Sequence, residues 1–396
     1  MVATLTRRLG SKYLSLAEDA VQDALMTALE QWPFRGVPDQ PEAWLFQVAR
    51  NRALDRLRHQ RMATEKSSAI AQQAPATTPP QSSLLRDELP LMEDDQLELI
   101  LLCCHPALPA DARVTLALKL AGGFSVSEIA RAFLSQEATI AQRLVRAKRL
   151  LREHDVDIGM PDPGALSLRL DSVLDTLYLM FNEGYAATSG DALVRDDVAA
   201  EAIRLASLVA GHPVTAAPRA WALLALMKLH AARFPARADS DDSPFLLRDQ
   251  DRSKWDRGLL AAGFRALERA SSGDFVSQYH LEAGIAACHA SAATWERTDW
   301  PQILELYDEL LALTGSPVVA VNRAVALSRI EGAMSGLAAL DAIGDRRSLD
   351  RYPVLPAIQA ELWREAGDLQ RATECYRSAL SLARSEPERR WLVSRL

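Results

Sequence analysis

The amino-acid sequence predicts an all-α protein with two small helical domains followed by a longer helical-repeat domain. Apolar residues recur at three- and four-residue steps through most of the chain, which is the spacing of an amphipathic helix. Runs of β-branched residues bounded by turn residues are few. With 396 residues, of which 48% are hydrophobic, the chain is long and apolar enough for two or three separate cores.

The sequence argues against a membrane-spanning, a secreted or a metal-binding protein. No uninterrupted apolar run approaches the roughly 20 residues that span a bilayer, and the N-terminus lacks the apolar core and cleavage site of a signal peptide. We therefore expect a cytoplasmic protein with no membrane segment. The four cysteines do not have the paired spacing of a zinc or redox motif, so we expect small buried side chains and no metal. They are Cys103, Cys104, Cys288 and Cys375.

The first predicted helix, Leu16 to Trp32, follows a short and weakly basic start. Its expected buried stripe is Val21, Leu25, Ala28, Leu29 and Trp32. Its expected solvent face is Asp19, Gln22, Asp23, Thr27 and Gln31. That face is acidic and polar.

A second helix begins at Pro41, after a loop from Pro33 that holds three prolines and a glycine. Its inward positions are Leu45, Val48, Ala49, Leu54 and Leu57. Its outward positions are Arg50, Asn51, Arg52, Asp55, Arg56, Arg58 and Arg61. This face is basic, although the chain carries a net charge of -7. A local basic surface of this kind suits nucleic acid.

The stretch from Ala63 to about Leu84 is poor in bulky residues and predicts a flexible linker. From Glu65 to Asp95 the chain holds six acidic and two basic residues. Two helices are then expected, Asp94 to Cys104 and Pro109 to Ala121.

The stretch from Gly122 to Leu151 predicts a helix-turn-helix. Ser125 and Glu128 have the spacing of a capping box, which starts a helix expected to end at Leu134. Ser135 and Gln136 form a short polar turn before the second helix. Ile140, Leu144, Ala147 and Leu151 form the expected buried stripe of that helix, and the other face carries Thr139, Gln142, Arg143, Arg146 and Arg149, with Lys148 at its edge.

Five basic residues and no acidic one lie between Thr139 and Arg152. A solvated amphipathic helix would also show such a face. The order of a capped short helix, a tight turn and a longer basic helix favours DNA binding, because this arrangement lays the second helix in the major groove.

These segments resemble conserved regions two and four of an extracytoplasmic-function RNA polymerase sigma factor. The resemblance covers residues 10 to 153 and is carried by LAEDAVQDALMTALEQW, PEAWLFQVARNRALDRLR and LPADARVTLALKLAGGFSVSEIARAFLSQEATIAQRLVRAKRLL in that order. It divides the chain into region 2 (residues 1–62), a linker (63–93), region 4 (94–155) and an extension (165–396).

The resemblance implies three contact surfaces, for core RNA polymerase and for promoter DNA. Asp19, Gln22 and Asp23 would meet the clamp helices of the polymerase. Trp44, Asn51, Arg52, Asp55 and Arg56 would meet the minus-ten element, where a base is flipped from the stack; a core anchor is an equal alternative for Trp44. Thr139, Gln142, Arg143, Arg146, Lys148 and Arg149 would meet the minus-thirty-five element through base edges or phosphates.

The extension predicts stacked helical hairpins. Pro353 to Glu386 has the small, aromatic and turn positions of a 34-residue tetratricopeptide repeat: Ala360, Trp363, Gly367, Asp368, Ala372, Tyr376 and Ala379. An earlier unit has its turn at Asp299 and Trp300, with Ile303, Tyr307 and Leu310 in the second helix, and a degenerate unit between them turns at Gly332. Such units stack into a curved solenoid.

Three further motifs, LYLMFNEGYAATSG, LLRDQDRSKWD and YHLEAGIAACHA, resemble the extension of one sigma subgroup. Their polar residues are Asn182, Glu183, Tyr185, Asp249, Asp251, Arg252, Asp256, His280, Glu282 and His289. A sensor pocket for a metal or small molecule is one interpretation, and hydrogen-bonded struts between helices are the favoured one, since no pair has a tight metal-ligand spacing. The subgroup also suggests a small YCII-like partner protein.

Two hypotheses of function remain at this stage. The first is a sigma factor regulated by its own repeat domain, and the second is a stand-alone helix-turn-helix regulator whose repeat domain senses a ligand. No nucleophile and base fall together, so we expect neither an enzyme nor a cofactor. The helix from Leu16 to Trp32 separates the hypotheses, because only a sigma factor needs a surface for core polymerase.

Overall fold

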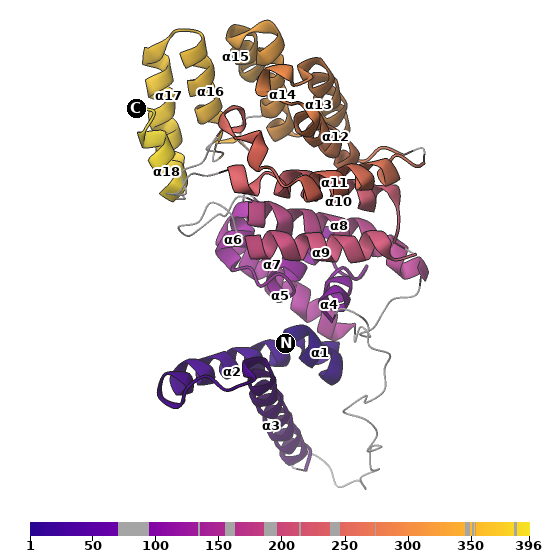
Figure 1. Ribbon diagram of the computed structural model, residues 1–396. Coiled ribbons are helices and arrows are strands. Elements are labelled where there is room, and N and C mark those ends of the chain that lie inside the picture. Colours follow the sequence, from indigo (N-terminus) through magenta and orange to yellow (C-terminus); the bar gives the residue numbers. More distant parts are fainter. Residues whose placement is uncertain are drawn as a thin grey trace. The chain divides into compact units, whose positions relative to one another are not determined.

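The computed structural model is built from helices and short helical turns, and its described residues contain no strand (Figure 1). The described residues are 1–69, 95–133, 135–154, 163–185, 196–213, 215–237, 246–273, 275–344, 349–350, 352, 354–383 and 386–396. They form two compact units. The N-terminal unit comprises Met1–Ile129 and Glu137–Val173, and the C-terminal unit comprises Ala130–Gln136 and Leu174–Leu396.

The first core of the N-terminal unit lies between α1 (Val2–Leu9), α2 (Leu14–Arg35) and α3 (Pro41–Ala69). Small side chains dominate it: Ala17, Ala20, Ala24, Ala49 and Ala53 are all fully buried. Because alanine has so little bulk, α2 and α3 can approach closely. Leu5, Leu9, Val21 and Leu57 fill the remaining space.

The expected buried stripe of α2 was wrong at two positions. Leu25 and Leu29 are 43% and 70% exposed, because the alanine-rich face from Ala17 to Ala28 supplies the contact with α3. Trp32 is half-buried, and its ring packs against the Trp44 ring with centroids 5.6 Å apart. The α2 helix therefore leaves large apolar side chains uncovered within the described part of the N-terminal unit.

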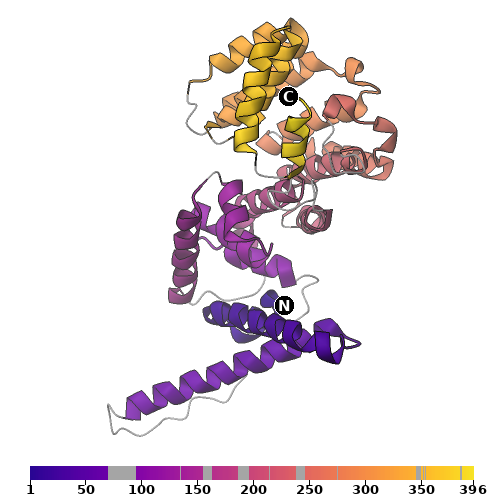
Figure 2. The same ribbon diagram turned by 90° about the vertical axis from the view of Figure 1, so that its left-hand side faces the viewer.

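Two expected helix ends also differ from the structure. The α2 helix continues through Pro33 to Arg35 and ends at Gly36, whose φ of 80° is in the left-handed region that favours glycine. The α3 helix runs on to Ala69, past the expected linker start at Ala63, because Ala63 to Ala69 contains no glycine or proline. The rest of the expected linker lies outside the described residues. In Figures 1 and 2 the second half of α3 projects beyond α1 and α2.

The second part of the N-terminal unit contains α4 (Asp95–Cys103), α5 (Ala110–Leu120) and α7 (Glu137–Glu153). Cys103 and Cys104 are fully buried, as expected for small core side chains, whereas Cys288 and Cys375 elsewhere in the chain are only half-buried. The first helix of the helix-turn-helix, α6 (Val126–Ala132), ends two residues before the expected Leu134, which lies outside the described residues.

The C-terminal unit is a succession of antiparallel helices, and one helix, α8 (Pro163–Tyr185), continues into it from the N-terminal unit. α9 (Asp196–Gly211), α11 (Arg257–Ala270) and α12 (Gln278–Ser291) pack around α10 (Pro218–Ala231), nine of whose 14 residues are buried. Short 3-10 turns, η2 (Phe234–Ala236), η3 (Leu247–Asp249) and η4 (Arg252–Lys254), lie in the connection between α10 and α11.

Helical hairpins form the end of this unit (Figure 1). They are α12 with α13 (Trp300–Thr314), α14 (Pro317–Glu331) with α15 (Ala333–Asp341), and α16 (Val354–Glu365) with α17 (Leu369–Leu382); α18 (Glu386–Val393) follows. The turns fall where the sequence predicts them. Asp299 and Asp368 each accept a hydrogen bond at a helix start, and Gly332 has a φ of 95°. Among the described residues, no helix is long and apolar enough to cross a bilayer.

Candidate nucleic-acid interface

The second helix of the helix-turn-helix, α7, presents one buried and one exposed face. Ile140, Leu144, Ala147 and Leu151 are buried, so the predicted stripe is confirmed. The predicted capping box is also present, because the Ser125 amide donates to Glu128 at 2.7 Å and the Glu128 amide donates to the Ser125 hydroxyl at 3.1 Å. This pair fixes where α6 begins.

Four of the six predicted minus-thirty-five residues are exposed: Thr139, Gln142, Arg146 and Arg149. Arg149 pairs with Glu153 one turn later in the helix, with 3.4 Å between Nε and the carboxylate. Exposed pairs of this kind contribute little to stability. The exposed face therefore offers hydroxyl, amide and guanidinium groups. These are the side-chain types that contact base edges and phosphates.

The other two predicted residues are held by carboxylates. Arg143 Nε lies 2.9 Å from Asp111 Oδ2 on α5, and Lys148 Nζ lies 2.6 Å from Glu18 Oε2 on α2. Both contacts are within the N-terminal unit. In this state Arg143 and Lys148 serve protein packing, so binding DNA would require them to leave these partners.

Sequence reasoning missed one side chain on this face. Val145 is 69% exposed, next to Arg146 and opposite the buried stripe. Its position off the stripe was the signal that could have identified it. A valine methyl group in the major groove can contact the methyl group of thymine.

The basic face of α3 combines exposed and paired groups. Asn51 and Arg52 are exposed, although Asn51 Oδ1 accepts a hydrogen bond from Gln47 at 3.4 Å, and Asp55 accepts one from Arg58 at 2.9 Å. Trp44 is half-buried against Trp32, which fits the core-anchor alternative for this residue and leaves part of its ring accessible.

Arg56 joins the basic face of α3 to the acidic face of α2. Its Nη2 lies 2.6 Å from Asp23 Oδ2 and its Nη1 lies 3.3 Å from Asp19 Oδ2. The structure thus brings a predicted DNA contact together with two predicted polymerase contacts. Gln22, the third predicted polymerase contact, is exposed beside them.

A polar hollow of about 550 Å³ lies over this part of α2. Its lining combines the predicted polymerase contacts with two predicted DNA contacts: Ser15, Glu18, Asp19, Gln22, Asp23, Arg56 and Lys148. Next along the same helix are four exposed apolar side chains, Leu25, Met26, Leu29 and Phe34. The exposed surface of α2 is therefore acidic at one end and apolar at the other.

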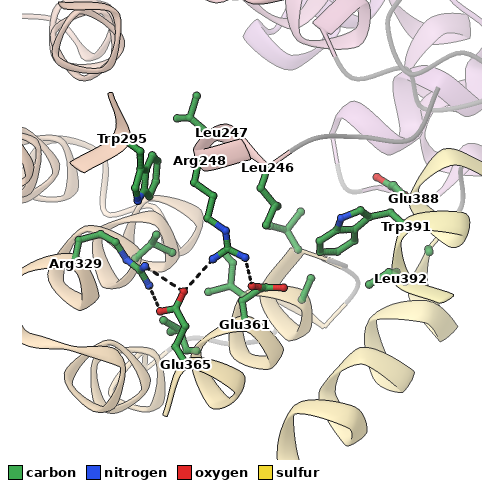
Figure 3. A pocket seen from close by; sticks show the side chains of 16 residues that line it. Leu246, Leu247, Arg248, Trp295, Arg329, Glu361, Glu365, Glu388, Trp391 and Leu392 are labelled. Carbon is green, nitrogen blue, oxygen red and sulfur yellow. Dashed lines mark hydrogen bonds and ion pairs between the residues drawn. The ribbon is translucent and has the colours of Figure 1, made fainter. Parts of the chain in front are cut away.

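A second hollow, of about 320 Å³, lies in the C-terminal unit and is lined mostly by apolar side chains (Figure 3). Trp295 and Trp391 stand on its two sides. Arg248 bridges Glu361 at 2.6 Å and Glu365 at 3.0 Å, and Arg329 also pairs with Glu365. Although burial raises the pKa of Glu361, hydrogen bonds from Tyr376, Arg364 and Arg248 bring it to about 2. Both arginines of this pocket are thus paired with glutamates.

None of the ten polar residues singled out in the sequence lines that pocket. Several instead make local structural hydrogen bonds. Asp251 and Asp256 cap η4 and α11, and His280 bonds the start of its own helix and the Ala270 carbonyl. Glu282 bonds Tyr178. No group of three potential metal ligands occurs in the part of the chain that the structure describes.

The fold and these exposed faces define a helical DNA-binding protein with two separate basic surfaces. Family models match in the same places: Sigma-70 region 2 matches residues 1–62, and Sigma-70, region 4 matches residues 98–151. The chain belongs to the sigma-70 family of sigma factors. A third model, a family of unknown function (DUF6596), matches residues 169–271.

Comparison of whole chains adds one relative. An uncharacterized protein of Rhizobium meliloti (strain 1021) is 36% identical over 385 residues, which are 97% of this chain and 90% of that protein. The similarity therefore includes the C-terminal unit as well as the two sigma regions. No solved structure matches the chain.

Proposed function

We propose that this protein binds core RNA polymerase, directs it to specific promoters, and is regulated by its own C-terminal unit, as an extracytoplasmic-function type of sigma factor acting in the cytoplasm. The observation that carries the proposal is the presence in one chain of two DNA-binding faces and a separate exposed acidic and apolar face on α2. A stand-alone DNA-binding regulator has no use for this third face.

The minus-thirty-five element would be read by α7. Gln142 and Arg146 are exposed on its outer face and have the hydrogen-bonding groups for base edges, while Thr139 and Arg149 extend the same face toward phosphates. Val145 adds an apolar contact. Arg143 and Lys148 would join after release from Asp111 and Glu18.

The minus-ten element would be met by α3 and the loop before it. Asn51 and Arg52 are the exposed groups, and Trp44 supplies a partly accessible ring on which a flipped base can stack. Asp55 and Arg56 complete the proposed surface. Both are engaged with other side chains in the structure, so they would rearrange on binding.

The polymerase would dock on α2. Asp19, Gln22 and Asp23 form the polar end of the surface, and Leu25 and Leu29 form its apolar end. Such a composition suits a partner that binds and later dissociates, because the charged end steers association and the apolar end supplies buried area. The Glu18–Lys148 pair borders this surface, and its opening would free α2 and α7 together.

The C-terminal unit would act as the regulatory part, with its hairpins stacked in the manner of tetratricopeptide repeats. Repeat arrays of this kind present extended concave surfaces to partners. A small YCII-like protein is one candidate partner, on the basis of the subgroup resemblance alone. Affinity capture with the full chain, followed by identification of bound proteins, would test that candidate.

Run-off transcription tests the proposal. The purified chain, added to core polymerase and a promoter-containing template, should yield a transcript of defined length that is absent without the chain. The template should carry the promoter of a gene whose transcript becomes more abundant when the protein is overproduced. Absence of any chain-dependent transcript, together with tight binding of the chain alone to duplex DNA, would favour the stand-alone regulator.

A further inference from the structure

Three arginines gather where α8, α10 and α12 end in the C-terminal unit. Arg233 and Arg237 flank η2, and Arg252 begins η4. Half-buried aromatic and imidazole side chains surround them: Tyr185 at the end of α8, His230 at the end of α10 and His289 at the end of α12. We call these six residues the arginine cluster.

Short distances connect the members of the cluster into one group. Arg233 Nη1 lies 3.5 Å from His230 Nδ1, and the Arg237 guanidinium lies 3.6 Å from the centre of the Tyr185 ring. The Tyr185 and His230 rings are 5.1 Å apart. On the other side, the guanidiniums of Arg233 and Arg252 both lie over Trp255, at 5.8 and 4.8 Å from its ring centre.

Among the described residues, the backbone and amide acceptors of these arginines are neutral. Arg233 donates to the Gln250 amide oxygen at 3.3 Å, and Arg237 donates to the Tyr185 carbonyl. Arg252 donates to the carbonyls of His289 and Ala292 at 2.5 and 2.7 Å.

Within the described part of the chain, no carboxylate forms an ion pair with any of the three arginines. Glu296 attracts Arg252 only from beyond ion-pair distance, and its side chain is fully exposed. Other arginines of the same unit behave differently, since Arg248 and Arg329 are each paired with a glutamate. The arginine cluster thus gathers three guanidinium groups without a carboxylate in ion-pair contact.

Two buried atoms in the cluster also lack a hydrogen-bond partner among the described residues: Arg252 Nη2 and His289 Nδ1. Leaving a buried guanidinium nitrogen without an acceptor is costly, and natural proteins seldom do so without a functional reason. Arg252 Nη2 gives the cluster unused donor capacity in addition to unbalanced charge, and His289 Nδ1 is a further donor in one tautomer of the neutral ring.

Burial and the arginine charges together shift the pKa values of the neighbouring groups. Burial, with the charges of Arg233 and Arg237, lowers the pKa of His230 to about 3. Burial, with Arg233 and Arg252, lowers the pKa of His289 to about 4. For Tyr185, burial raises the pKa, but the nearby Arg233 and Arg237 outweigh it and the pKa falls below its ordinary value.

We propose that the arginine cluster is a binding site for a small oxyanion ligand, one that carries a phosphate or carboxylate group. Guanidinium groups bind both anions through paired, charge-assisted hydrogen bonds, and a bound anion would supply the missing charge and acceptors. The site lies wholly in the C-terminal unit and does not depend on the proposed sigma function. The proposal therefore names the chemical class of the ligand that the C-terminal unit would bind.

Replacement of Arg233 separates this proposal from a purely structural role. Arg233 is central to the cluster: it lies 3.3 Å from the Gln250 amide oxygen and 3.5 Å from His230 Nδ1, and it also acts on the Tyr185 hydroxyl. If the cluster is a ligand site, Arg233→Gln removes repulsion in the ligand-free protein, and the melting temperature stays the same or rises. If the cluster is a structural strut, the melting temperature falls.

The experiment follows thermal unfolding and calorimetric binding of the full chain in inorganic phosphate, sulfate or citrate, with chloride at equal ionic strength as reference. We expect at least one oxyanion to raise the melting temperature of the wild-type chain, and Arg233→Gln to weaken its binding at least about tenfold. Comparison of phosphate and citrate distinguishes a phosphate ligand from a carboxylate ligand. Arg233→Lys, which keeps the charge, should retain part of the response.

Arg257→Gln is the matched control, because Arg257 is exposed at the start of α11 and outside the cluster. It should respond to the anions like the wild-type chain. The proposal is overturned if none of the oxyanions stabilises the chain more than chloride, if Arg233→Gln responds as strongly as wild type, or if Arg233→Gln lowers the melting temperature in chloride.

Discussion

The arginines of this protein differ in whether a carboxylate is paired with them. On α7, Arg146 is exposed, whereas Arg143 is paired with Asp111. In the C-terminal unit, Arg248 and Arg329 have glutamate partners, and the arginine cluster has none among the described residues. Spacing along a helix identifies which residues share a face. It does not identify which of them a distant carboxylate will hold, because that depends on tertiary packing.

Arg146→Ala should weaken promoter binding by the polymerase complex. An arginine that contacts a base contributes about 1–3 kcal/mol, so affinity should fall roughly fivefold or more. Binding of core polymerase should be unchanged, because Arg146 is not part of the proposed docking surface on α2. Filter binding of the complex to promoter DNA measures the effect. Arg152→Ala, which removes an exposed charge one turn outside the proposed face, is the control, and an equal loss there would contradict a specific role for Arg146.

Glu282 should make the stability of the C-terminal unit depend on pH. Burial raises its pKa to about 7 in the folded chain, although a Tyr178 hydrogen bond opposes the shift. A raised carboxyl pKa gives stability that is fully present below about pH 4.5 and is lost as pH rises through 7. Glu282→Gln should therefore match wild type near pH 4.5 and be more stable at pH 8, by at most about 3 kcal/mol.

Denaturant unfolding followed by tryptophan fluorescence measures this difference at the two pH values. Glu268→Gln, an exposed change on α11, is the control and should show no such pH-dependent gain. A Glu282→Gln chain that is less stable than wild type at pH 8 would show that the ionised carboxylate contributes favourably.

Whole helices show how much the sequence could predict. The capping box of α6 and the four buried residues of α7 were predicted correctly, because capping and helical periodicity are local properties. The buried face of α2 was predicted wrongly at Leu25 and Leu29. Ranking side chains by size favoured the leucines, whereas close packing on α3 selected the alanines. The pocket of Figure 3 could not be predicted, since its lining comes from five separate segments of the chain.

Replacing both exposed leucines of α2 should reduce affinity for core polymerase without unfolding the chain. Leu25→Ser with Leu29→Ser removes apolar area that is already in solvent, so thermal stability should change little. The proposed docking surface loses its apolar end, and binding to core polymerase should weaken at least about tenfold. Surface plasmon resonance on immobilised core polymerase measures this. Leu313→Ser, at a leucine 52% exposed on α13, should bind like wild type.

The whole molecule combines a sigma-type N-terminal unit with a helical C-terminal unit of comparable or greater length. Residues 1–151 contain both sigma regions, and the match to a relative over 97% of the chain shows that the two parts occur together elsewhere. Composition and periodicity were enough for the all-α fold. They could not reveal the arginine cluster, since its members come from four separate stretches of the sequence and are brought together only in the folded unit.

Promoter affinity with and without core polymerase tests the central claim most directly. A fluorescent promoter duplex is titrated with the chain alone and then with the chain and core polymerase together, at the same salt concentration. We predict tight and sequence-specific binding only for the assembled complex. Equal affinity for the promoter in the absence of polymerase would contradict the account.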